Sequence, residues 1–144
     1  MSSETSNYFC RMCIKEENHV LNYTRKVSKM LEINLEFRKG IFFVRLKGKL
    51  TKDTVYKLKE EVTKRILKSG IRNVVFNIEE LEEIDLKGIS SLLYNYEICN
   101  KNNGKSLLCG IKNYKIKLKL EQSRLLKYIN ETENELSAFK IMNV

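Results

Sequence analysis

Residues 73–93 read NVVFNIEELEEIDLKGISSLL, and this stretch decides how the rest of the chain is organised. It opens with the apolar run Val74–Ile78, whose β-branched and aromatic residues are typical of a buried strand. The acidic segment Glu79–Glu83 follows and is expected to form a loop. Asp85 then precedes apolar residues at helical spacing, and its carboxylate is suited to accept hydrogen bonds from the unpaired N–H groups of a first helical turn. The stretch therefore predicts a strand, an acidic loop and a capped helix over about residues 86–102.

The segment upstream predicts a hairpin and a helix. Residues 31–38 alternate apolar and polar side chains, which is the period of a half-buried strand. Lys39 and Gly40 are expected to turn the chain into a second strand over residues 41–46, giving a β-hairpin. An amphipathic helix follows, with Thr51 or Asp53 as its cap and a glycine, Gly70, at its C-terminus. A strand, a helix and a further strand in this order predict a right-handed crossover with parallel pairing.

The segment downstream is less regular. Residues 106–110 form a short apolar run and are expected to be a fourth strand. Residues 113–120 alternate lysines with apolar side chains, and this periodicity alone indicates an amphipathic strand. We expect residues 125–129 to carry the last edge strand or its approach, and residues 131–141 to form a closing helix. Thr132, with Glu135 three residues later, fits a capping box for that helix.

The composition restricts the class of protein. A chain of 144 residues with 42% apolar and 31% charged residues is typical of a soluble globular domain. No apolar run approaches the roughly 20 residues of a membrane helix, and no signal-like segment begins the chain, so we expect a cytoplasmic protein without membrane insertion. Cys99 and Cys109 fall in expected core elements, and buried reduced thiols are favoured over disulfides.

The net charge of +9 raises the alternative of a nucleic-acid-binding protein. Lysines greatly outnumber arginines and are spread along every expected element, without clustering among aromatic residues. No nucleic-acid-binding motif stands out. A basic nucleic-acid-binding protein is therefore kept as one functional alternative.

Residues 1–29 differ from the rest in pattern. Cys10 and Cys13 form a C-x-x-C, and His19, the only histidine, follows six residues later. A zinc site needs four ligands and no second pair completes this set, while a redox C-x-x-C normally follows a strand. We expect a variable or disordered extension over residues 1–29 and a domain over residues 30–144. Met30 stands directly before the first strand and is a candidate for the true start of the protein.

The residue pattern offers little to an enzyme. Catalysis needs a nucleophile, a base or a metal converging on a pocket. The only histidine lies in the extension, the carboxylates of residues 79–85 crowd a segment expected to be solvated, and no Gly-rich phosphate-binding loop is present. The sequence therefore predicts a non-enzymatic protein with no catalytic residues, no cofactor and no metal site.

The junction Asp85-Leu86-Lys87-Gly88-Ile89-Ser90, between an apolar strand and a helix, resembles the STAS domain family. The likeness is greatest to its stand-alone bacterial members, the anti-sigma factor antagonists or anti-anti-sigma factors. That family reads roughly Asp-Ser-Ser/Thr-Gly-Leu-Gly here. The aspartate, the glycine and the following apolar residue match, whereas both hydroxyl positions differ.

The resemblance covers residues 30–144 and implies an α/β fold with a four- to five-stranded mixed sheet and helices packed mainly on one face. It also implies a short helix at residues 113–120, and we follow it there against the periodicity.

The resemblance implies a regulatory module that binds an anti-sigma factor, often a serine protein kinase, and so releases a sigma factor. The residues expected at its partner-binding edge are Thr51, Asp85, Leu86, Lys87, Gly88, Ile89, Ser90 and Ser91. At Thr51 the family usually carries an aspartate. Phosphorylation of the hydroxyl before the glycine abolishes binding in that family by adding charge. Lys87 occupies this position, so we expect the switch to be absent, with Ser90 and Ser91 as the nearest substitute acceptors.

Two interpretations of the missing motif hydroxyls, at Leu86 and Lys87, stay open. The protein binds its partner constitutively, with Leu86 and Ile89 as apolar contacts and Lys87 pairing a partner carboxylate. Alternatively, it is a diverged STAS module that serves as scaffold or regulatory subunit of a stress-signalling or transporter complex. In either case we expect a monomer or a weak dimer.

Overall fold

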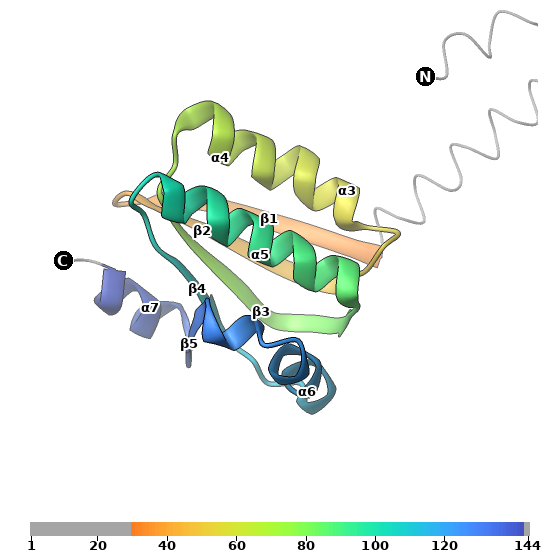
Figure 1. Ribbon diagram of the computed structural model, residues 1–144. Helices are drawn as coiled ribbons and strands as arrows, with labels where there is room; N and C mark the ends of the chain where they lie inside the picture. Colours follow the sequence, from red (N-terminus) through yellow and green to blue (C-terminus); the bar gives the residue numbers. More distant parts are fainter. Residues whose placement is uncertain (1–29, 143–144) are drawn as a thin grey trace, which may run out of the picture. The chain divides into compact units, whose positions relative to one another are not determined.

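A computed structural model describes residues 30–142, and a five-stranded mixed sheet forms the centre of this part of the chain (Figure 1). Strand β1 runs antiparallel to β2, and β2, β3, β4 and β5 pair in parallel, in that spatial order. The strands are β1 (Leu31–Arg38), β2 (Ile41–Leu50), β3 (Asn73–Ile84), β4 (Ser106–Cys109) and β5 (Asn130–Thr132). The predicted hairpin and parallel crossover are confirmed. The predicted extension, with Cys10, Cys13 and His19, lies outside the described residues.

The helices pack mainly on one face of the sheet, as predicted. They are α3 (Val55–Leu58), the π-helical η1 (Lys59–Thr63), α4 (Lys64–Ser69), α5 (Leu86–Lys101), α6 (Tyr114–Gln122), the 3₁₀ turn η2 (Leu125–Lys127) and α7 (Glu135–Met142). The main hydrophobic core joins one sheet face to the helix that runs from α3 through η1 to α4, and to α5 and α6. A smaller cluster of buried residues holds α7 against the opposite face.

Several local predictions are confirmed. Gly70 ends α4 in the left-handed conformation, with φ 65°. Asp85 caps α5, and the helix predicted over residues 113–120 is present as α6. Cys99 and Cys109 are buried and free, and burial raises the pKa of the Cys109 thiol to about 12.

The predicted acidic loop over Glu79–Glu83 is wrong, because β3 continues through these residues. Strand β2 is likewise longer than predicted and continues alongside. Lys47 pairs with Glu80 and Lys49 with Glu83, so lysines of one strand lie next to carboxylates of the other. Two register shifts interrupt the pairing here, and they hide the period of two by which a strand is recognised in a sequence.

The predicted caps of the first helix, Thr51 and Asp53, are also wrong. The helix begins after Thr54, and Thr54 makes no side-chain bond to its first turn. Instead the Thr54 hydroxyl oxygen accepts a hydrogen bond from the Thr51 N–H at 2.9 Å and donates to the Lys49 carbonyl at 2.8 Å. These bonds stabilise the loop after β2, which explains why a threonine lies at the helix start without capping it.

The C-terminal segment agrees with the prediction in one place and differs in another. Residues 125–129 contain the η2 turn and form the approach to the edge strand β5, which follows them. The cap of α7 is Asn134, whose side-chain oxygen accepts a hydrogen bond from the Ser137 N–H at 2.9 Å. Thr132 cannot take this role because it is paired with Cys109 in the sheet.

A partly buried ion pair attaches α7 to the sheet. The Arg45 guanidinium donates to both carboxylate oxygens of Glu135, at 2.7 and 2.8 Å, and the Asn77 amide donates to the same carboxylate at 2.7 Å. These hydrogen bonds, led by those from Arg45, hold the pKa of the Glu135 carboxyl below its usual value.

The start of α5 lies unusually close to the end of β2. A Cβ atom built on Gly88 would stand 2.2 Å from the Leu50 carbonyl oxygen and 2.9 Å from Cγ1 of Ile84. This close backbone approach requires a glycine, and no larger residue fits without moving backbone.

We expect Glu135→Gln to lower the free energy of unfolding by about 1–3 kcal/mol at neutral pH. Because the folded-state pKa of Glu135 is depressed, its contribution is complete above the unfolded pKa of about 4.3 and is lost as the pH falls through the folded pKa. Urea unfolding from neutral to acidic pH should therefore show a smaller acid dependence in the variant. Glu131→Gln is the control, because Glu131 lies 3.8 Å from Lys117 in an exposed pair. Equal losses in both variants would contradict this role.

We expect Gly88→Ala to destabilise the protein by about 1–3 kcal/mol, because the new methyl group meets backbone atoms that cannot yield freely. Alanine favours helices over glycine by roughly 1 kcal/mol, so helix propensity alone predicts the opposite sign. Thermal or urea unfolding distinguishes the two. The matched control is Ser90→Ala on the exposed side of the same turn, which should be neutral or slightly stabilising. A Gly88→Ala variant as stable as the parent would contradict the close approach.

Candidate functional site

Asp85 holds the junction between β3 and α5 in place. Its Oδ1 accepts a hydrogen bond from the Gly88 N–H at 2.9 Å, and its Oδ2 accepts one from the Lys52 N–H at 2.8 Å. The Asp85 N–H in turn donates to the Leu50 carbonyl at 3.3 Å. One side chain thus caps α5 and ties it to the loop after β2, so the first turn of α5 has a fixed position.

The first turn of α5 presents three side chains to the surface. Leu86 is 75% exposed, which is unusual for a leucine at the start of a well-packed helix. Lys87 and Ser90 are exposed beside it. We call these three residues the junction edge. It combines an apolar side chain, an ammonium group and a hydroxyl on one turn.

The other predicted site residues lie beneath or beside the junction edge. Thr51, Gly88 and Ile89 are buried. Ser91 is half-buried, and its hydroxyl donates to the Gly88 carbonyl at 2.6 Å. Of the predicted site residues, Leu86, Lys87 and Ser90 thus lie at the surface, and the buried ones support that surface from below.

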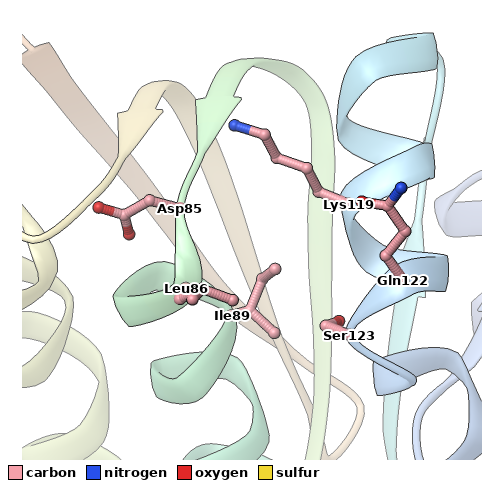
Figure 2. Close-up of a pocket in the computed structure, with 6 residues that line it drawn as sticks. All are labelled: Asp85, Leu86, Ile89, Lys119, Gln122 and Ser123. Carbon is pink, nitrogen blue, oxygen red and sulfur yellow. The ribbon is translucent and has the colours of Figure 1, made fainter.

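A cleft of about 350 Å³ separates the start of α5 from α6 (Figure 2). It is lined by Asp85, Leu86, Ile89, Lys119, Gln122 and Ser123. Figure 2 shows Leu86 and Ile89 on the α5 side of the cleft, with the Asp85 carboxylate pointing away from α6. The Lys119 ammonium reaches across and donates to the Ile84 carbonyl at 3.0 Å, which links α6 to the end of β3.

The α6 side of this cleft was missed by the sequence analysis. Lys119, Gln122 and Ser123 are three and four residues apart, so they share one helix face. The sequence analysis expected a helix over residues 113–120, but nothing in the sequence indicated that this helix lies next to the start of α5.

The electrostatics of the junction edge favour an anionic partner. The amino end of a helix carries partial positive charge, which the Asp85 carboxylate offsets in part by capping α5, and no acidic residue lies within the first turn itself. Lys87 adds a full positive charge at the same place, where the helix dipole disfavours it by about 0.3–1 kcal/mol. A carboxylate arriving from outside would relieve this unfavourable arrangement.

Two other kinds of site find no support in residues 30–142. No three His, Cys, Asp or Glu side chains there gather closely enough to hold a metal ion. None of the helices in that range is both long and apolar enough to cross a membrane. The junction edge with its cleft is therefore the candidate site that the described residues support best.

Comparison with known proteins agrees with this architecture. The anti-sigma F factor antagonist of Paenibacillus polymyxa is 25% identical over 114 residues, which cover 79% of this chain and 97% of that protein. A putative anti-sigma factor antagonist from Thermotoga maritima superposes with a TM-score of 0.73 at 13% identity, covering 78% of this chain and 95% of that one. The phosphorylated form of the Bacillus cell fate determinant SpoIIAA superposes with a TM-score of 0.60 at 17% identity, covering 76% and 98%.

The two solved structures share the fold at low identity, with the same mixed α/β arrangement as residues 30–142. The family model of the STAS domain matches residues 32–138, which is most of the chain. The chain therefore belongs to the STAS domain family.

Proposed function

We propose that this protein is a bacterial anti-sigma factor antagonist of the cytoplasm, which binds its anti-sigma factor through the junction edge and the adjoining cleft. The observation that carries the proposal is the pair Leu86 and Lys87, exposed side by side on a turn that the Asp85 hydrogen bonds hold in place. The alignment with the Paenibacillus anti-sigma F factor antagonist covers nearly the whole length of that protein, which supports the same assignment.

The contact combines apolar burial with charge pairing. Leu86 exposes most of its surface next to the cleft, so a partner side chain seated there would remove both from water. Burying a leucine side chain contributes about 1.5–3 kcal/mol. Lys87 would pair with a partner carboxylate at the rim, where charge mainly sets the association rate and the orientation.

The proposed binding has no Ser/Thr phospho-switch at the family position. Lys87 stands there and has no hydroxyl to accept a phosphoryl group. The Ser91 hydroxyl is engaged with the Gly88 carbonyl, and phosphorylation would break that bond inside the first turn. Ser90 is exposed but lies beyond the glycine, so a kinase that recognises the family's acceptor would meet it in a different geometry. The protein therefore acts as a constitutive antagonist.

We expect Leu86→Ala and Lys87→Glu each to weaken binding to the anti-sigma factor by about tenfold or more. The first removes apolar contact, and the second sets a negative charge against a partner carboxylate. Titration calorimetry measures both. Lys101→Glu, at the opposite end of α5, changes the net charge equally and should leave the affinity unaltered. If Lys87→Glu binds as tightly as the parent, Lys87 is not at the contact.

A tagged pull-down from the native cell, with mass spectrometry and phosphosite mapping, tests the function itself. We expect an anti-sigma factor of the serine kinase type, recovered with the unmodified protein. Phosphate on Ser90 or Ser91 would contradict the absence of a switch. Recovery of a transporter or a complex of several STAS proteins, with no anti-sigma factor, would overturn the function while leaving the fold. Nucleic acid recovered with a steep salt dependence would do the same.

A further inference from the structure

We propose that the outer edge of β1, which no other strand of residues 30–142 pairs, is a homodimer interface, at which two copies pair their β1 strands antiparallel about a two-fold axis through Leu35. This inference goes beyond the proposed function, and none of its residues belongs to the junction edge or the cleft.

Strand β1 is a long, regular edge of the sheet. It is the outermost of the five strands, spans eight residues and pairs with β2 without a register shift. No proline occurs in the chain to block it. The opposite edge, β5, has only three residues. Exposed sheet edges are normally kept short, bulged or covered. We therefore expect an edge of this length and regularity to be covered by another chain.

The turn before β2 determines which backbone groups face outward. Lys39 and Gly40 have φ of 51° and 81°, as a two-residue hairpin turn requires, so Arg38 and Ile41 flank it as a hydrogen-bonded pair. Hydrogen-bonded and non-hydrogen-bonded pairs alternate from there. Even-numbered residues of β1 thus bond to β2, and odd-numbered residues direct their N–H and C=O groups outward. The Leu31 carbonyl accepts a hydrogen bond from Lys57 at 2.6 Å, which leaves residues 33–37 as the pairing segment.

Pairing about Leu35 satisfies these outward groups. Leu35 then lies opposite its own copy, and Ile33 lies opposite Phe37 of the second copy. All of these are odd-numbered, so their N–H and C=O groups meet in hydrogen-bonded pairs. The arrangement is isologous, since each contact occurs twice across the two-fold axis.

The charges on the other sheet face select the same register. With the axis at Leu35, Glu32 lies opposite Arg38 of the second copy, and Asn34 opposite Glu36. Both are non-hydrogen-bonded pairs, in which side chains approach most closely. An axis at Asn34 would instead oppose Glu32 to Glu36, and an axis at Glu36 would oppose that glutamate to itself. A register centred on Phe37 also pairs Glu36 with Arg38, but it sets the turn residues Lys39 and Gly40 opposite Leu35 and Asn34. The register centred on Leu35 is therefore the one that pairs opposite charges with every partner inside the strand.

The core-side face supplies apolar contact for this pairing. Phe37 is 60% exposed, and it lines an open pocket of about 340 Å³ with Leu35, Arg65 and other residues. Ile33 and Leu35 are half-buried. In the proposed dimer, Ile33 of the second copy lies beside Phe37, which withdraws both from water.

Charge reversal tests the interface in the full chain. Sedimentation equilibrium over about 5–500 µM should show a monomer–dimer equilibrium for the parent. Arg38→Glu sets a glutamate opposite Glu32 twice per dimer and should weaken dimerisation by about tenfold. The double variant Glu32→Arg/Arg38→Glu restores opposite charges and should return the dissociation constant to near that of the parent.

Two controls separate the interface from the stability of the monomer. Arg38 lies 3.6 Å from Glu36 and 5.7 Å from the Phe43 ring centroid, so Arg38→Glu also loses contacts within one copy. The double variant loses the same contacts, so its recovery would reflect the interface alone. Lys101→Glu matches the charge change of Arg38→Glu and should dimerise normally. A parent that stays monomeric overturns the proposal. So does a dimer that Arg38→Glu leaves intact or that the double variant fails to restore.

Discussion

The close approach of α5 to the end of β2 is the constraint on which the functional surface depends. At Gly88 the helix lies against the Leu50 carbonyl with no room for a Cβ atom. Asp85 adds two hydrogen bonds that join the helix start to the loop after β2. Helix position, loop position and strand end are thus fixed by one another. The backbone of the first turn of α5 therefore has little conformational entropy to lose if a partner binds there, as we propose.

This fixed turn carries an unusual pair of side chains. Leu86 gains little from exposure to water, and Lys87 adds positive charge where the helix end is already positive. Both features are unfavourable for the isolated chain and favourable for a complex with an acidic, partly apolar partner surface. Under the proposed function, Lys87 stands where the family carries its switch hydroxyl, and regulation would then depend on the amount of the protein or of its partner.

The sequence was sufficient for most of the fold, because the apolar runs and the glycines mark the central strands and the helix ends. Prediction failed where contacts with neighbouring elements, and not the alternation of apolar and polar residues, determine the secondary structure. The acidic part of β3 is a strand because it pairs with the end of β2, where Lys47 is opposite Glu80 and Lys49 opposite Glu83, and the register shifts there conceal the pattern. In the site, Asp85 and Gly88 could be predicted from cap and close-approach chemistry. Lys119 and its neighbours could not, since the cleft exists only once α6 is placed next to α5.

Amide hydrogen exchange measured with and without the anti-sigma factor tests the central claim most directly. The account predicts that binding slows exchange in the first turn of α5, at residues 86–91, and along the α6 wall of the cleft around Lys119. Exchange in β1 and α7 should not respond to the partner. Protection confined to β1 or α7, with no change at the start of α5, would contradict the assignment of the partner site to the Asp85–Gly88 junction.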